Sequence, residues 1–220
     1  MTRKERAQLI TEKLKELYPR AVCSLNYTTP IEMLIATQLS AQCTDARVNI
    51  VTAELFKKYT SVYDFAAADY DELCCDIRST GFYRNKAKNI IAASQRIIDE
   101  YGGNVPDTME DLLTLPGTGR KTANLVLGDI FKKPAIVVDT HCIRLSNRMG
   151  LTKNTDPVKI EMDLKKVIAA EESNDFCHRT VMHGRAVCTA RKPKCDECGL
   201  YDICPKKGIK IELRYKTVLL

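Results

Sequence analysis

Four cysteines near the C-terminal end of the chain have a spacing that could hold an inorganic centre. Cys188, Cys195, Cys198 and Cys204 form a C-x6-C-x2-C-x5-C pattern within one short stretch. Only Cys195 and Cys198 make a CxxC pair, whereas a structural zinc normally takes two such pairs or paired cysteine and histidine ligands. The uneven gaps favour a cubane iron–sulfur cluster, because its corners lie farther apart than the ligands of one zinc ion. A zinc site in a regulatory protein is the alternative interpretation.

A glycine-rich segment that carries a lysine lies near the middle of the chain. Residues 115–123 read Leu-Pro-Gly-Thr-Gly-Arg-Lys-Thr-Ala and stand between two predicted helices. The glycines let the backbone approach a neighbour closely, and the following helix N-terminus has free N–H groups that favour an anion such as a DNA phosphate. The segment superficially resembles a P-loop, but Arg120 separates the glycine from the lysine and no strand precedes it. An ordinary interhelical turn is the other alternative.

Lys121 and Asp139 are the candidates for catalytic chemistry. An ordinary lysine has a pKa of about 10.4 and is therefore a poor nucleophile at neutral pH. The positive end of the predicted helix disfavours the ammonium form of Lys121, Arg120 adds to this effect, and burial would act in the same direction. Asp139 follows an apolar run and precedes another helix, so it is expected to be an N-cap. A carboxylate fixed there could also stabilise a developing sugar cation or move protons. For Lys121 alone, a phosphate contact is the alternative.

Composition and charge limit the classes of protein. The chain has 220 residues, ten cysteines and a net charge of +6. Its N-terminus is charged and no segment approaches the length of a membrane span, so we expect a soluble, intracellular protein without a disulfide framework. Basic residues exceed acidic ones in 117–153 and 185–220, while acidic residues dominate 155–175, which indicates that a polyanion faces one side. The cysteines outside the loop are predicted to be small buried hydrophobes: Cys23, Cys43, Cys74, Cys75, Cys142 and Cys177.

Helical periodicity dominates the chain and predicts an all-α fold. Residues 135–138 look extended but are too few to form a sheet. Thr29 with Pro30, Asp107, Asp139 and Asp156 with Pro157 are expected to start helices, and Gly102 is expected to end one. The predicted helices cover about residues 6–18, 31–41, 45–59, 62–67, 70–79, 85–101, 109–113, 120–131, 140–149, 157–170 and 175–187.

These motifs together resemble the endonuclease III family, the helix-hairpin-helix DNA glycosylases that carry a 4Fe–4S cluster. The matching segments are 39–45 (Leu-Ser-Ala-Gln-Cys-Thr-Asp), 115–123, 138–141 (Val-Asp-Thr-His) and the cysteine loop 188–204, and the resemblance covers about residues 5–206. The resemblance implies two helical domains with a DNA cleft between them. One would be a six-helix barrel with the helix-hairpin-helix, residues 23–133. The other would be the iron–sulfur cluster domain, formed by residues 1–22 and 134–220.

The resemblance also implies a bifunctional DNA glycosylase and AP lyase of base excision repair that removes oxidised pyrimidines. Lys121 would attack C1′ of the damaged nucleotide and form a Schiff base, which allows β-elimination 3′ to the abasic site. Asp139 would assist base loss. The four loop cysteines would hold the cluster. The implied partner is double-stranded DNA with damaged pyrimidines or abasic sites, and the protein is expected to be a monomer in the cytoplasm, associated with the nucleoid and not with a membrane.

Further contacts follow from the resemblance. Gln42 would fill the gap left in the duplex, and Phe82 stands where related enzymes often carry a leucine wedge. The remaining implied contacts are backbone phosphate contacts at Gly117 and Gly119, a base pocket bordered by Ser40 and His141, and phosphate contacts from Arg185, Arg191, Lys192 and Lys194. The related adenine-specific glycosylase lacks the lysine and usually has an extra C-terminal domain, whereas here Lys121 is present and about 16 residues follow the loop. A non-catalytic DNA-binding module is the rival from another class, but a pure binder has no need of a lysine–aspartate pair.

Overall fold

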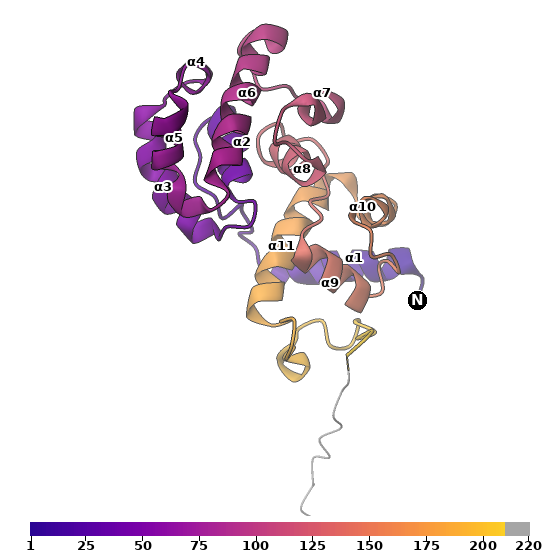
Figure 1. Cartoon of the computed structure of the whole chain (residues 1–220). Coiled ribbons are helices and arrows are strands. Elements are labelled where there is room, and N and C mark those ends of the chain that lie inside the picture. The colour runs from indigo at the N-terminus through magenta and orange to yellow at the C-terminus, as the bar shows by residue number, and fades with distance from the viewer. Residues whose placement is uncertain (210–220) are drawn as a thin grey trace, which may run out of the picture. The chain divides into compact units, whose positions relative to one another are not determined.

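Helices make up the regular structure of residues 1–209, which are the residues that the computed structural model describes (Figure 1). The α-helices are α1 (Arg3–Leu17), α2 (Pro30–Leu39), α3 (Asp45–Lys58), α4 (Val62–Ala66), α5 (Tyr70–Asp76), α6 (Tyr83–Tyr101), α7 (Met109–Thr114), α8 (Arg120–Asp129), α9 (Thr140–Arg148), α10 (Pro157–Lys165) and α11 (Ser173–Ala186). Three short 3₁₀ helices are η1 (Arg78–Thr80), η2 (Ala170–Glu172) and η3 (Cys195–Glu197). No residue in this range lies in a β-strand, so the all-α prediction is confirmed.

Side chains at the helix starts set most of the element boundaries. Thr29 caps α2 in a reciprocal arrangement with Glu32, and Pro30 occupies the first turn, as predicted. Gly102 ends α6 in the left-handed conformation. Asp107 does not cap α7, contrary to prediction. The cap is Thr108, whose hydroxyl accepts the N–H of the third helical residue, and Asp107 instead pairs with Lys133 at 2.6 Å.

Several boundaries differ from the prediction because local backbone breaks are hard to read from periodicity. The helix predicted over residues 70–79 is divided into α5 and η1, with Ile77 between them. The helix that was predicted to reach residue 170 ends at Lys165. Helix α6 begins at Tyr83, two residues earlier than predicted, directly after Phe82 in the left-handed conformation.

The contacts divide the chain into two compact units. The hairpin unit comprises residues 20–137 and 170–178, and the cysteine unit comprises residues 1–19, 138–169 and the chain from residue 179. Helix α11 contributes its first part to the hairpin unit and its second part to the cysteine unit. The predicted cluster domain included residues 170–178, which the contacts place in the hairpin unit.

Two helices form the centre of the hairpin unit. In α2, every residue from Met33 to Leu39 is buried, and in α8 the buried run extends from Thr122 to Asp129. A helix that is buried on all sides must be largely apolar, as both are outside a few hydrogen-bonded positions. Helix α8 packs against α2 and α7, while α6 packs against α2, α4 and α5 (Figure 1). The segment between α7 and α8 is thereby attached to the most buried part of the unit.

The extended segment before α9 obtains its hydrogen bonds from α11 and not from a sheet. The Ala135 N–H donates to Ser173 Oγ at 3.0 Å, and the Val137 N–H donates to Cys177 Sγ at 3.2 Å. Residues 135–137 are buried, and buried N–H groups need such partners. The prediction of an extended segment without a sheet is confirmed.

The cysteines outside the loop are less uniformly buried than predicted. Cys74, Cys142 and Cys177 are buried, but Cys23 and Cys43 are partly exposed and Cys75 is exposed. The prediction was wrong for Cys75 because adjacent residues of a helix point about 100° apart, so Cys74 faces the core and its neighbour faces solvent. None of the helices within residues 1–209 combines the length and apolar character needed to cross a membrane.

Candidate functional site

The loop between α7 and α8 has one glycine that the fold requires and one that it does not. Gly117 has φ +75°, and a Cβ atom there would lie 2.8 Å from Cβ of Asn89. Gly119 has φ −94° and is the N-cap residue of α8, and a Cβ atom on it would meet nothing within 4 Å. Gly119 therefore leaves the start of α8 uncovered, with no side-chain cap on its first N–H groups.

A buried glutamine, which the sequence analysis did not identify, fixes this loop. The Gln38 side chain of α2 donates through Nε2 to the Pro116 carbonyl at 3.0 Å and to Thr118 Oγ1 at 3.2 Å. Both Gln38 and Thr118 are buried. These bonds join the loop to the central helix, so the start of α8 is held by the core of the unit. The contact spans 78 residues of sequence, and no local pattern indicates it.

Lys121 lies in the first turn of α8, as predicted, and its side chain is exposed. The side chain is therefore not buried in the free protein. Its amine makes no hydrogen bond or ion pair with the described residues of the hairpin unit. The amine is thus available to a ligand at the uncovered end of the helix.

Two exposed residues of the hairpin unit have backbone conformations that favour glycine. Gln42 has φ +54° and Phe82 has φ +50°, and the Phe82 side chain is 63 % exposed. The left-handed region costs a non-glycine residue about 1–2 kcal/mol. Such strain is retained where the surrounding structure enforces it, frequently at functional sites. Lys132 and Lys206 are the other described non-glycine residues with positive φ.

The predicted base-pocket residues belong to different units. Ser40 follows α2, is partly exposed, and donates through Oγ to the Thr37 carbonyl at 2.8 Å. His141 lies in the first turn of α9 in the cysteine unit, with Nδ1 3.1 Å from Nη2 of Arg144. Burial lowers the pKa of His141, with a further lowering by Arg144 and Arg185, while Asp139 acts in the opposite direction.

Asp139 is the N-cap of α9, as predicted. Its Oδ1 accepts the Cys142 N–H at 2.7 Å, and the side chain is partly exposed. The second oxygen, Oδ2, accepts no hydrogen bond from the described residues of the cysteine unit. One oxygen is therefore used for the fold and the other is free for a ligand. Asp139 and Lys121 are carried by different units.

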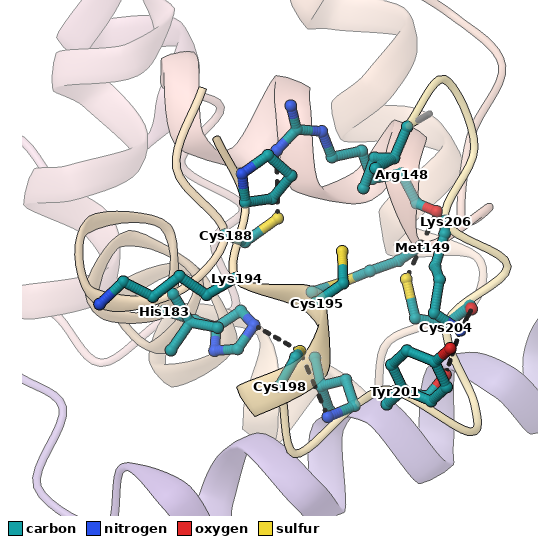
Figure 2. Close-up of a pocket in the computed structure, with 14 residues that line it drawn as sticks. Arg148, Met149, His183, Cys188, Lys194, Cys195, Cys198, Tyr201, Cys204 and Lys206 are labelled. Atoms are coloured by element: carbon teal, nitrogen blue, oxygen red, sulfur yellow. Dashed lines mark hydrogen bonds between the residues drawn. The ribbon is translucent and has the colours of Figure 1, made fainter. Parts of the chain in front are cut away.

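The four loop cysteines line one pocket of the cysteine unit, and their sulfur atoms surround a common space (Figure 2). All four are free thiols. Burial raises the pKa of Cys195, Cys198 and Cys204, and the neighbouring loop sulfurs raise it further. Holding all four sulfurs as thiolates would therefore require a positive centre among them. No group of three or more His, Cys, Asp or Glu side chains within residues 1–209 is arranged to hold a single metal ion. Four cysteine sulfurs around one pocket are the donor set that a 4Fe–4S cluster takes.

Two arginines of α9, which the sequence analysis did not single out, hold the start of the cysteine loop. Arg144 donates through Nε and Nη2 to the Cys188 carbonyl at 3.2 and 3.1 Å. Arg148 donates through Nη1 to Cys188 Sγ at 3.3 Å (Figure 2). The same nitrogen donates to the Thr189 carbonyl at 2.7 Å. The two side chains are four residues apart and share one face of α9. This spacing is visible in the sequence, but the partners are not.

A buried histidine contacts the third loop cysteine. Nε2 of His183 lies 3.4 Å from Cys198 Sγ (Figure 2). Its Nδ1 lies 3.0 Å from the Tyr18 hydroxyl. Burial lowers the pKa of His183 to about 4, so the ring is neutral at neutral pH. Because burial also raises the pKa of Tyr18, its hydroxyl stays protonated and can donate to Nδ1. In the tautomer that accepts this hydrogen bond on Nδ1, the imidazole proton lies on Nε2, which faces the sulfur.

The four predicted basic contacts of this region are exposed. Arg185 lies near the end of α11, and Arg191, Lys192 and Lys194 lie within the cysteine loop. The loop backbone is ordered around them, since the Lys194 N–H donates to the Val187 carbonyl at 3.0 Å and Thr189 Oγ1 donates to the Lys192 carbonyl at 2.7 Å. The basic region predicted over 185–220 continues into residues 210–220, which lie outside the described residues.

The helical fold, the glycine-rich loop before Lys121 and the cysteine loop define a class of DNA repair protein. Comparison with known proteins agrees with this assignment. Residues 35–170, more than half of the chain, match the model of the HhH-GPD superfamily of base excision DNA repair proteins. Residues 188–204 match the iron–sulfur binding domain of endonuclease III.

Individual relatives give the same result. The chain is 54 % identical to endonuclease III of Synechocystis sp., over 93 % of this chain and 94 % of that protein. It is 44 % identical to endonuclease III of Bacillus subtilis, over 90 % and 94 %. The chain belongs to the endonuclease III family. It is therefore a DNA glycosylase with AP lyase activity and carries a 4Fe–4S cluster, which confirms the resemblance and cofactor predicted from the sequence.

Solved structures support the fold over nearly the whole chain. A trapped endonuclease III–DNA covalent intermediate, in an estranged-adenine complex, matches with a TM-score of 0.88 and 43 % identity, over 94 % of this chain and 97 % of that one. A thermostable thymine-DNA glycosylase matches with a TM-score of 0.82 at 23 % identity, over 92 % of this chain and 96 % of that one, which shows the shared fold alone.

Proposed function

We propose that this protein removes oxidised pyrimidines from double-stranded DNA and cuts the strand 3′ to the resulting abasic site through a Schiff base on Lys121. The observation that carries the proposal is the exposed Lys121 amine, which has no partner among the described residues of its unit, in the first turn of an uncapped helix. A relative that is 43 % identical has been trapped as a covalent intermediate with DNA, which supports covalent chemistry in this family.

The proposed reaction begins with the neutral Lys121 amine. Its lone pair attacks C1′ and the glycosidic bond between C1′ and the base nitrogen breaks. The base leaves with the electron pair of the glycosidic bond and takes up a proton. Opening of the sugar ring then gives an iminium ion between C1′ and Nζ. Loss of a C2′ proton allows the C3′–O bond to break with departure of the 3′ phosphate, and water finally releases the lysine. The free Oδ2 of Asp139 is suited to stabilise positive charge on the sugar and to accept a proton from the amine.

DNA contacts of two kinds are proposed on the two units. On the hairpin unit, Gly117 and Gly119 would offer backbone N–H groups to a phosphate, and Gln42 and Phe82 would enter the gap left by the extruded nucleotide. Ser40 and His141 would border the extruded base. The exposed basic residues of the cysteine unit would contact further phosphates: Arg185, Arg191, Lys192 and Lys194.

Cys188, Cys195, Cys198 and Cys204 are the proposed ligands of the cluster. When bound, the cluster links four points of one loop and offsets the charge of four thiolates. Arg148, which donates to Cys188 Sγ, and His183, which lies against Cys198 Sγ, would stabilise those sulfurs. The chain contributes an ordered loop that presents cations to DNA, and no step of the proposed reaction passes through iron.

Borohydride trapping tests the nucleophile. Abasic duplex DNA is incubated with the full-length holoenzyme and sodium borohydride, which reduces a Schiff base to a stable amine. A covalent adduct is expected for the native protein and for Lys57→Gln, an exposed lysine of α3 outside the proposed site, and none for Lys121→Gln. An adduct that persists in Lys121→Gln would assign the chemistry to another amine, and no adduct with the native protein would favour a non-catalytic binder.

The lesion class is tested separately. Single-turnover base release is measured on duplexes that carry one oxidised pyrimidine, one oxidised purine or one undamaged pyrimidine. Release is expected from the oxidised pyrimidine alone. Equal release from the oxidised purine would contradict the proposed substrate while leaving the Schiff-base mechanism intact.

A further inference from the structure

A buried lysine of α6 lies at the junction of two turns of the hairpin unit. The Lys86 side chain is 6 % exposed. Its Nζ donates to the Leu39 carbonyl at 2.7 Å and to the Thr80 carbonyl at 2.9 Å. Lys86 is thus bound to backbone at two places that are far apart in the sequence. Among the groups near its ammonium is the thiol of Cys43.

Each of these carbonyls precedes a strained, exposed residue. Leu39 is the last residue of α2, and Gln42 follows it by three positions with φ +54°. Thr80 ends η1, and Phe82 follows it by two positions with φ +50°. One ammonium therefore joins the starts of the two turns that present Gln42 and Phe82. All of these residues belong to the hairpin unit, so the arrangement is internal to one compact body.

Burying the ammonium group of Lys86 is energetically unfavourable, so its presence at this position needs an explanation. Burial lowers the pKa of Lys86, which means that the surroundings disfavour its charged form. The carbonyls offset this cost, because the C-terminal end of α2 carries partial negative charge and Leu39 has no later helical N–H to accept. An apolar side chain would fill the space, but it would not fix the position of either backbone. Two short, charge-assisted hydrogen bonds fix both backbone segments.

We propose that Lys86 is a positioning residue that holds the turns of Gln42 and Phe82 in the conformation that enters a gap in the DNA duplex. The inference rests on the function proposed above for Gln42 and Phe82. By holding both turns before DNA arrives, Lys86 removes the entropic cost of ordering them on binding. Lys86 touches neither the DNA nor the reacting atoms, and it acts through the two side chains.

The test compares two DNA duplexes. Dissociation constants of the full-length holoenzyme are measured for an undamaged duplex and for one with a tetrahydrofuran abasic analogue, which contains a gap but cannot react. In Lys86→Met, the affinity for the undamaged duplex is expected to stay within about twofold, while the preference for the abasic analogue falls about tenfold. Lys88→Met, which changes an exposed lysine on the same helix, is the matched control and should leave both constants unchanged.

A double-mutant cycle separates positioning from general damage to the fold. The double variant Gln42→Gly with Phe82→Gly removes both side chains. It also removes the backbone strain, because glycine adopts a positive φ without steric cost. In this background, Lys86→Met should cause no further loss of abasic preference. A 2-aminopurine opposite the abasic analogue provides a second readout: its fluorescence should rise on binding of the native protein and rise less with Lys86→Met.

The outcomes distinguish the inference from the function on which it rests. If the double glycine variant keeps the native abasic preference, the proposed role of Gln42 and Phe82 fails and the role of Lys86 fails with it. If that variant loses the preference but Lys86→Met keeps it, only the Lys86 inference is overturned. Equal weakening of both duplexes by Lys86→Met, or a loss that persists in the glycine background, also overturns it. Should Lys86→Met not fold, Lys86→Gln, which keeps one donor group, replaces it in every measurement.

Discussion

At the scale of single residues, Asp139 can serve the fold and the chemistry at once because a carboxylate has two oxygens. Oδ1 caps α9 and Oδ2 is free among the described residues of its unit. The side-chain amide of an Asp139→Asn variant would still present an oxygen to the Cys142 N–H, and asparagine is as good an N-cap as aspartate. We therefore expect this substitution to change the free energy of unfolding by less than about 1 kcal/mol and to slow base release by about 10²–10⁴-fold. Urea denaturation and single-turnover base release measure the two effects. An unchanged rate of base release in this variant would show that Asp139 serves only as the N-cap of α9.

The two glycines of the hairpin give a second residue-scale prediction. Alanine at Gly117 would have to adopt φ +75° and would press on Asn89, so Gly117→Ala should lower the free energy of unfolding by at least about 1–2 kcal/mol. Gly119→Ala has an ordinary φ and open space, so its expected loss of stability is limited to the poorer N-cap propensity of alanine, about 0.5–1 kcal/mol. Its methyl group would instead occupy the surface proposed for a phosphate. Gly119→Ala should therefore weaken DNA binding with a smaller loss of stability than Gly117→Ala, and similar unfolding midpoints for the two variants would contradict this distinction.

At the scale of elements, α9 connects the proposed catalytic carboxylate to the cysteine loop. Asp139 caps its start, and Arg144 and Arg148 bind the loop from its later turns. His141, on the same helix, is a titratable group whose environment favours the neutral form. The stability of this helix should therefore respond to mild acid.

The sign of this response follows from the lowered pKa of His141. Between that lowered value and about 6.5, the ordinary pKa of histidine, the unfolded chain binds a proton that the folded chain does not. The contribution of His141 to stability is present above about pH 6.5 and is lost as the pH falls through this window. We expect urea denaturation between about pH 8 and pH 5 to show decreasing stability, with a shallower decrease in His141→Gln. Part of the slope should remain, because the pKa of His183 is lowered in the same sense. An identical slope in the variant would assign the effect to other groups.

The sequence predicted many element boundaries whose signals are local, although Thr108 and not Asp107 caps α7. Thr29 with Pro30, Asp139 and Gly102 act on backbone groups within a few residues, so the boundaries they set could be read directly. The same holds for the motifs around Lys121 and for the cysteine spacing. Gln38 and Lys86 could not be found this way, because their partners lie 78 and 47 residues away and only the packed core brings them together. Burial of single side chains was the other failure, since Cys74 and Cys75 differ only in the direction that each faces.

At the scale of the whole molecule, the net charge of +6 predicts that the affinity for DNA depends on salt. The contribution of each cationic surface to this salt dependence can be measured separately. Each phosphate neutralised by a lysine or arginine releases condensed counterions, so the logarithm of the binding constant falls with the logarithm of the salt concentration by about 0.9 per contact. Arg191 and Lys192 are exposed and lie on a loop whose backbone is fixed by hydrogen bonds, so they can meet phosphates without first becoming ordered.

Replacing both of these residues by glutamine removes two cations without altering the cysteines or the arginines that hold the loop. The plot of the logarithm of the binding constant against the logarithm of the salt concentration should become shallower by about 2 if each side chain contacts one phosphate. Affinity should fall for damaged and undamaged duplexes alike. Lys4→Gln with Lys57→Gln removes the same charge from exposed positions on α1 and α3, outside the proposed contacts, and controls for net charge alone. Binding is measured by fluorescence anisotropy from low to moderate salt. If the control pair flattens the slope as much as the loop pair, the protein attracts DNA through its overall charge and the loop is not a specific contact. A change confined to the loop pair would instead place a defined phosphate-binding surface beside the cluster.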